Sequence, residues 1–123
     1  MLTDTQYIVL TENNFHTEVL KAKTLVLVDC WASWCSSFYQ INPVYRQLQN
    51  SFPEAIKIGR LNIATAEKLA ALYGIRVVPT LLLFHNGQLV ERVIGCLSQP
   101  DLTRKLNSLL SAPMISRSHA ASL

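Results

Sequence analysis

The stretch Leu25–Ser37, LVLVDCWASWCSS, decides which fold the chain can adopt. Its first six residues are apolar except for Asp29, and such a run is typical of a strand that is covered on both faces of a sheet. A short turn follows, and Cys35 stands where a helix should open. The stretch therefore predicts a buried strand over residues 25–30, a turn, and a helix from Cys35 to about Asn50.

Working outward from this strand, apolar runs and helical spacings alternate along the chain. Further strands are expected over residues 7–10, 56–63, 80–84 and 89–94, and further helices after Thr11, after Thr65 and over residues 102–110. The pair Asn86-Gly87 is a strong signal for a hairpin between the last two strands. The predicted order is β-α-β-α-β-α-β-β-α, with parallel pairing in the first half and antiparallel pairing in the second.

Turn and cap residues set the expected helix boundaries. Thr11 and Thr65 are each expected to cap the helix that follows them. Gly74 is expected to end the helix after Thr65. Ser98 and Asp101 have the spacing of a capping box before the last helix.

Length and composition favour one globular domain. Of 123 residues, 50% are hydrophobic and 15% charged, so residues 1–110 are expected to fold and residues 111–123, which lose all periodicity, to form a disordered tail. The formal net charge is +3 without a long basic run, which argues against a nucleic-acid partner. The apolar runs are too short to span a membrane, and no secretory signal is visible.

The cysteine pattern points to free thiols. Three cysteines, Cys30, Cys35 and Cys96, form no disulfide framework, so we expect a reducing, cytoplasmic setting. The cysteines and histidines follow no metal-ligand spacing, and no metal site is expected.

Three segments together carry a family likeness: LVLVDCWASWCSS, YGIRVVPTLLLFHNGQLV (residues 73–90) and VIGCLS (residues 93–98). They occur in the order and at the separations of thioredoxin, and the chain resembles the thioredoxin family over about residues 5 to 110. The resemblance implies an α/β thioredoxin fold, in which a central mixed sheet of about five strands is flanked by four helices.

The departures fall in the active-site motif. Where the family has Trp-Cys-Gly-Pro-Cys, this chain has Trp34-Cys35-Ser36-Ser37-Phe38. The resemblance identifies Cys35 as the nucleophile, and the helix N-terminus favours its thiolate. The buried second cysteine, which releases the product in the family, is replaced by Phe38.

Asp29 is the second candidate catalytic residue. Burial in an apolar strand would raise its pKa and suit it to proton transfer. In the family this aspartate assists the missing second cysteine, so a purely structural role beside Arg60, which stands in place of a family lysine, stays open. Cys30 should face the opposite side of the sheet from Asp29 and belong to the core.

The resemblance also implies a substrate groove. Pro79 would follow a cis peptide bond that turns the backbone of Val78 toward Cys35, so that an extended substrate can pair with it. Trp31 would support the active-site turn from inside. The expected groove residues are Trp34, Ser36, Ser37, Val78, Pro79, Gly95 and Cys96. Cys96 is either a groove-lining residue or an internal replacement for the resolving thiol, which would require Cα atoms within about 7 Å of each other.

Two functions remain in competition. The first is an enzyme: a monothiol protein-disulfide oxidoreductase or isomerase that forms mixed disulfides through Cys35 and is impaired as a dithiol reductase. It would need no bound cofactor, although glutathione could serve as co-substrate. The alternative is a redox-inactive module that binds a protein segment in the same groove. In both cases we expect a monomer with protein substrates or partners.

Overall fold

The computed structural model describes residues 7–34, 43–51, 55–95 and 99–111, and its elements follow the predicted order. They are β1 (Ile8–Leu10), the short π-helical segment η1 (His16–Leu20), β2 (Leu25–Trp31), α1 (Pro43–Ser51), β3 (Ile56–Asn62), α2 (Glu67–Leu72), β4 (Thr80–His85), β5 (Gln88–Ile94) and α3 (Gln99–Ser111). The expected α/β fold is confirmed.

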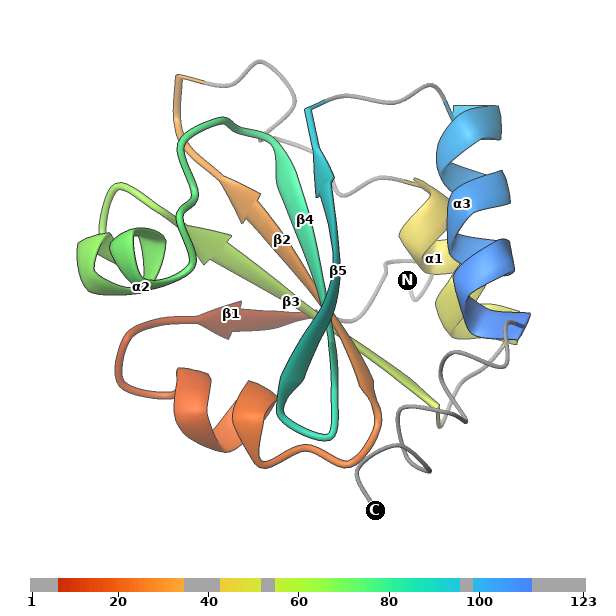
Figure 1. Cartoon of the computed structure of the whole chain (residues 1–123), viewed down its shortest axis with the longest axis horizontal. Helices are drawn as coiled ribbons and strands as arrows, with labels where there is room; N and C mark the ends of the chain where they lie inside the picture. The colour runs from red at the N-terminus through yellow and green to blue at the C-terminus, as the bar shows by residue number, and fades with distance from the viewer. Residues whose placement is uncertain (1–6, 35–42, 52–54, 96–98, 112–123) are drawn as a thin grey trace, which may run out of the picture.

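The five strands form one mixed sheet in the order β1-β3-β2-β4-β5 (Figure 1). β3 pairs in parallel with β1 and β2, whereas β4 is antiparallel to both β2 and β5. Cys30 near the end of β2 lies opposite Thr80 at the start of β4. As a result, the end of β2, the start of β4 and the end of β5 all lie at the same edge of the sheet.

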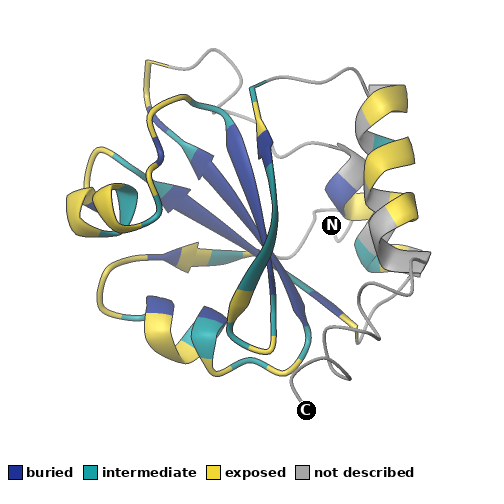
Figure 2. Ribbon diagram, in the orientation of Figure 1, coloured by how far each residue is buried: buried dark blue, intermediate teal, exposed yellow. Residues whose placement is uncertain are grey.

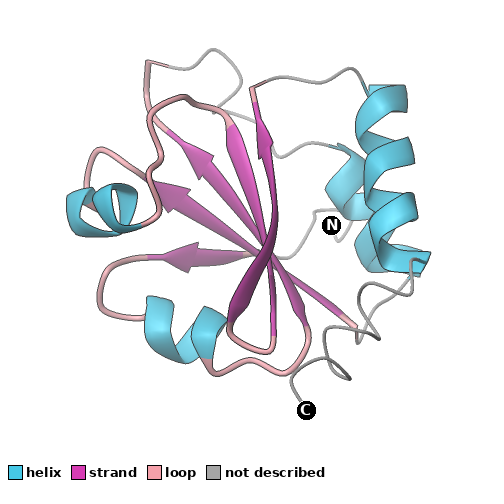
Figure 3. Ribbon diagram, viewed as in Figure 1, coloured by secondary structure: helices cyan, strands magenta, loops and turns pink. Residues whose placement is uncertain are grey.

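Helices cover both faces of the sheet (Figure 3), with α1 and α3 on one side and α2 and η1 on the other. Each side has its own apolar core, and the three central strands β2, β3 and β4 are buried for most of their length (Figure 2). The α1 side contains Leu25, Leu27, Tyr45, Ile56, Ile58, Leu81, Leu83 and Val93. The α2 side contains Leu10, Phe15, Val19, Val26, Val28, Cys30, Leu61, Ala66, Ile75, Leu82 and Phe84.

β2 is covered on both faces, as its apolar run, interrupted only by Asp29, predicts. Successive side chains of a strand point to opposite faces, so Leu25 and Leu27 enter one core while Val26 and Val28 enter the other. Asp29 continues the first series. Cys30 continues the second and is fully buried, which confirms that it belongs to the core.

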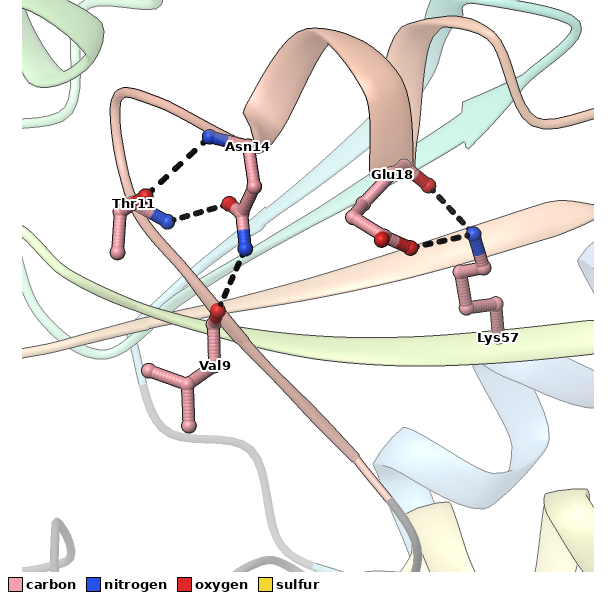
Figure 4. Close-up of polar contacts among 5 residues, drawn as sticks. All are labelled: Val9, Thr11, Asn14, Glu18 and Lys57. Atoms are coloured by element: carbon pink, nitrogen blue, oxygen red, sulfur yellow. Dashed lines mark hydrogen bonds and ion pairs between the residues drawn. The ribbon is translucent and has the colours of Figure 1, made fainter.

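Thr11 orders the turn that leads into the first helical segment (Figure 4). Its hydroxyl oxygen accepts from the backbone N–H of Asn14 at 3.2 Å, and the side-chain oxygen of Asn14 accepts from the N–H of Thr11 at 2.7 Å. The amide nitrogen of Asn14 donates to the carbonyl of Val9 at 2.9 Å. The N-cap position itself is Phe15, without a side-chain cap, so the prediction that Thr11 caps this helix is wrong: Thr11 orders the turn that precedes it.

Lys57 connects η1 to β3 through a hydrogen bond and an ion pair with Glu18 (Figure 4). Lys57 Nζ of β3 donates to the Glu18 carbonyl oxygen at 2.8 Å and to Glu18 Oε1 at 3.1 Å. Both side chains are partly exposed, so the pair adds modestly to stability.

The prediction that Thr65 caps α2 is wrong. The N-cap is Ala66 without a side-chain cap, and the Thr65 hydroxyl donates instead to the Asn62 carbonyl at 3.2 Å. The carboxylate of Glu12, far away in the sequence, accepts from the Lys68 N–H at 2.6 Å. A local capping motif is therefore replaced by a tertiary contact.

α1 and α3 are both predicted from the sequence, but their starts differ in outcome. α1 forms the later part of the helix expected from Cys35, and residues 35–42 lie outside the described residues. α3 begins at Gln99, earlier than the expected residue 102. Ser98 and the tail from residue 112 also lie outside the description. None of the helices within the described ranges has the length and apolar character needed to cross a membrane.

The hairpin between β4 and β5 turns at Asn86 and Gly87, as predicted. Both residues have positive φ, 52° and 79°, which is the geometry that favours Asn-Gly in two-residue turns. A Cβ on Gly87 would lie 2.6 Å from the backbone carbonyl oxygen of Leu20. The turn therefore packs against the end of η1 at a distance that only glycine permits.

Gly87→Ala is expected to lower the free energy of unfolding by about 2–4 kcal/mol, because backbone strain adds to a clash with a main-chain atom. Gly74→Ala is the matched control. Gly74 also has positive φ, 64°, but open space where its Cβ would stand, so about 1–2 kcal/mol is expected from the backbone alone. Urea unfolding measures both. Equal losses in the two variants would contradict the close packing of the turn against η1.

Candidate functional site

Exposed apolar side chains gather at the sheet edge where β2 ends and β4 begins. Trp34 follows β2 and is 68% exposed, Val77 precedes β4 and is 48% exposed, and Ile94 ends β5 and is 60% exposed. We call these three residues the apolar rim. Their burial against a partner would be favourable, since exposed apolar groups that cluster commonly mark an interaction site.

Residues 73–79, called the connector here, join α2 to β4 and end at the predicted groove residues. The Val78–Pro79 peptide bond is cis, and both residues are half-buried. The Thr80 hydroxyl donates to the Val77 carbonyl at 2.5 Å. The Gly95 N–H donates to the Pro79 carbonyl at 2.8 Å. Val78, Pro79 and Gly95 are thus brought together, as the resemblance implies.

Asp29 lies buried below this edge and forms an ion pair with Arg60. The two residues are register partners on β2 and β3, and Arg60 Nε donates to Asp29 Oδ2 at 3.2 Å. Burial raises the pKa of Asp29 above its ordinary value, while the charge and hydrogen bond of Arg60 act in the opposite direction. A carboxyl group in this setting can hold or release a proton nearer to neutrality than an exposed aspartate.

Aromatic rings enclose the Arg60 guanidinium. Its central carbon lies 5.2 Å from the centre of the Trp31 ring and 5.7 Å from the centre of the Tyr7 ring. Such cation–π contacts strengthen as water is excluded. Trp31 and Tyr7 therefore contact the guanidinium of an ion pair whose two side chains are almost entirely buried.

The sequence analysis missed two aromatic residues of this region. Tyr7 reaches Arg60 only because β1 pairs with β3 in the observed register, which no local pattern indicates. Tyr45 is buried on the same face as Asp29, and burial together with the nearby Asp29 charge raises its pKa. Its spacing from Ile41 and Leu48 on one helix face could have identified it as an inward residue.

Cys30 lacks the exposure and the low pKa that a reactive thiol needs. Burial raises its pKa to about 12, the Asp29 charge adds to the effect, and Arg92 opposes it. A thiol that stays protonated and buried at neutral pH is inert. Any thiol chemistry of the native chain must therefore come from its other cysteines.

Part of the predicted site lies outside the residues that the structure describes: Cys35, Ser36, Ser37, Phe38 and Cys96. Cys35 follows Trp34 directly in the chain, and Cys96 follows Gly95. Among the described ranges, no group of three or more His, Cys, Asp or Glu side chains could hold a metal ion.

Comparison with known proteins identifies the family. A family model described as thioredoxin matches residues 6–108. The chain is 35% identical over 102 residues to a thioredoxin of Chlorobaculum thiosulfatiphilum, covering 83% of this chain and 94% of that protein. It is 39% identical over 93 residues to a thioredoxin of Buchnera aphidicola subsp. Schizaphis graminum (strain Sg), covering 76% and 86%. It is 38% identical over 92 residues to thioredoxin C-2 of Corynebacterium nephridii, covering 75% and 85%.

The range matched by the family model includes the sheet, the connector and the apolar rim. The chain therefore belongs to the thioredoxin family.

Proposed function

We propose that this chain performs thiol–disulfide exchange through one nucleophilic cysteine, Cys35, and that it forms mixed disulfides with proteins or glutathione. Membership of the thioredoxin family supports a thiol–disulfide redox function. The observation that carries the finer proposal is the motif Trp34-Cys35-Ser36-Ser37-Phe38, which begins three residues after the last residue of β2 in the sequence. It keeps the first cysteine of the family motif and has no cysteine at position 38.

The proposed reaction has two exchange steps. The Cys35 thiolate attacks one sulfur of a target disulfide, forms a mixed disulfide with it and releases the other sulfur as a thiolate. An external thiol such as glutathione then attacks the mixed disulfide, restores Cys35 and leaves a new disulfide on the released group. Full reduction of the target consumes two external thiols, which supply the two electrons. If another thiol of the target attacks the target sulfur of the mixed disulfide instead, a different target disulfide forms, the Cys35 thiolate is released, and the result is isomerisation without an external reductant.

The described residues support this proposal by chemistry and position. Asp29 has a raised pKa and could exchange a proton with Cys35 through water. Thioredoxin family proteins bind protein substrates, and the apolar rim with Val78, Pro79 and Gly95 offers a surface for an extended protein segment. We propose that the chain acts as a monomer in the cytoplasm, where glutathione is the abundant thiol.

A redox-inactive binding module is the second candidate. The exposed side chains of Trp34, Val77 and Ile94 favour it as much as they favour an enzyme, because binding to them requires no thiol. The absence of a second cysteine at position 38 also favours it. The two candidates differ in whether Cys35 forms a covalent bond.

Cys35→Ser is expected to abolish mixed-disulfide formation and to lower the rate of glutathione-driven insulin reduction by about two orders of magnitude or more, because serine supplies no thiolate. Intact mass spectrometry after exposure to glutathione disulfide detects the mixed disulfide, and peptide mapping assigns it. Cys96→Ser is the matched thiol-to-hydroxyl control and should behave as the wild type.

The outcomes separate the candidates. If Cys35→Ser equals the wild type in every thiol assay yet retains the same protein partners, the binding module is correct and the redox proposal is wrong. If Cys96→Ser alone removes turnover while Cys35 still forms the mixed disulfide, Cys96 is the internal resolving thiol.

A further inference from the structure

A hydrogen bond connects the C-terminal end of α2 to β5, the edge strand of the sheet. Arg92 of β5 donates through Nη1 to the carbonyl of Tyr73 at 2.6 Å in a partly buried setting. Tyr73 is the C-cap residue of α2, so the guanidinium meets the negative end of the helix dipole. A charged donor to a backbone carbonyl is among the stronger hydrogen bonds in proteins.

α2 depends on such contacts because it is only six residues long, well below the length at which a helix is stable alone. Its first turn is held by the carboxylate of Glu12, and its last turn by Arg92. Glu12 lies in the turn after β1 and Arg92 in β5, and each has the charge that suits its end of the helix. The position of α2 is therefore set by tertiary contacts.

The connector begins where this bond is made. Tyr73 is its first residue, and Val77, Val78 and Pro79 follow before β4 starts. At its other end the N–H of Gly95, just after β5, donates to the Pro79 carbonyl at 2.8 Å. Hydrogen bonds thus join both ends of the connector to the β5 region: Tyr73 to Arg92 in β5, and Pro79 to Gly95, the residue after β5.

We infer that Arg92 is a positioning residue for the candidate substrate surface: through the Tyr73 carbonyl it fixes the connector that presents Val77 and Pro79. It acts through the backbone and touches no reacting group. The inference rests on the proposed function for its effect on substrates, but the positional claim stands by itself. The ring of Tyr73 also packs edge-on against Phe84 with centres 5.4 Å apart, so the test must distinguish the carbonyl bond from this aromatic contact.

Arg92→Met removes the donor and keeps an unbranched apolar stem. Hydrogen exchange of the Gly74 and Ile75 amides, which donate to Ala71 and Ala70, is expected to speed up by about tenfold or more. The amides of β2 should change much less. Arg92→Lys keeps a charged donor and should restore part of the protection. Arg104→Met is the matched control, because Arg104 pairs with Asp101 within the same exposed helix.

A kinetic measurement adds a readout that general loosening of the fold would not give. With glutathione as reductant, Arg92→Met should raise KM for insulin by about tenfold while kcat changes little. The rate with the small substrate 2-hydroxyethyl disulfide should stay unchanged, because it needs no extended binding surface.

Several results would overturn the inference. Unchanged exchange at Gly74 and Ile75, or equal acceleration in β2 and the connector, would remove the positioning role. Equal loss with insulin and with the small disulfide would mean that Arg92 affects the chemistry or the whole fold. If the wild type has no exchange activity, the proposed function fails, and hydrogen exchange still decides whether Arg92 fixes the connector.

Discussion

Arg60→Met is expected to lower the free energy of unfolding by about 3–5 kcal/mol at pH 7, because it leaves the Asp29 carboxylate buried without its partner. In the folded chain both side chains are almost entirely shielded, with only 10% and 12% exposed. The variant also loses the cation–π contacts with Trp31 and Tyr7. Urea unfolding followed by circular dichroism measures the loss.

The loss should depend on pH in a defined direction. Burial raises the pKa of Asp29 in the folded state, so between about pH 4 and that raised pKa the folded chain binds more protons than the unfolded chain. Stability therefore falls as pH rises through this window. Arg60 lowers the pKa of Asp29, so without Arg60 this pH range extends to higher pH. The difference between wild type and Arg60→Met should be smallest near pH 4 and largest at neutral pH.

Two further variants identify the cause. Adding Asp29→Asn to Arg60→Met removes the buried charge and should recover much of the stability at pH 7. Arg104→Met interrupts an exposed ion pair and should cost about 0–1 kcal/mol. A loss in Arg60→Met that is independent of pH, or that the double variant does not relieve, would show that the ion pair with Asp29 is not what matters.

Phe38→Cys is expected to speed the resolution of a mixed disulfide on Cys35 by several orders of magnitude when no external thiol is present, since the attacking sulfur becomes intramolecular. With Ellman's reagent in a Cys96→Ser background, the Cys35 thiolate releases one thionitrobenzoate and retains the other as a mixed disulfide. In Phe38→Cys the second thiol attacks Cys35, forms a disulfide between residues 35 and 38 and releases the second thionitrobenzoate. Stopped-flow absorbance and intact mass follow both steps.

Phe38→Ser separates the thiol from the change in side-chain volume. It removes the aromatic ring without adding a sulfur, so its adduct should persist as in the wild type. Two outcomes would contradict the proposal that the missing thiol limits this chain to one exchange step. One is an adduct that persists in Phe38→Cys, and the other is an adduct that disappears in Phe38→Ser.

The order of strands and helices along this chain could be predicted because its signals are local. The apolar run of β2, the Asn86-Gly87 turn and the helical spacings each depend on residues close together in the sequence. The alternation of β2 also predicted that Asp29 and Cys30 point to opposite faces, since one residue of offset decides the face. These features needed no knowledge of how distant segments meet.

The remaining features depend on register and tertiary contacts. Tyr7 lies over Arg60 only because of the pairing between β1 and β3. Glu12 replaces the expected cap of α2 from far away in the sequence, and Arg92 holds the other end of that helix across the sheet. A single sequence has no pattern that identifies such partners, because many surface charges could reach a helix end equally well.

Because Cys30 is buried, the rate at which its thiol is alkylated can report how often the fold opens. Since this thiol is fully buried in the central strand, reagents can modify it only in molecules whose sheet has separated. In a Cys35→Ser/Cys96→Ser background, its rate of pulse alkylation would follow the population of opened molecules under native conditions. The folding equilibrium could then be read from a natural side chain, without denaturant or an attached dye.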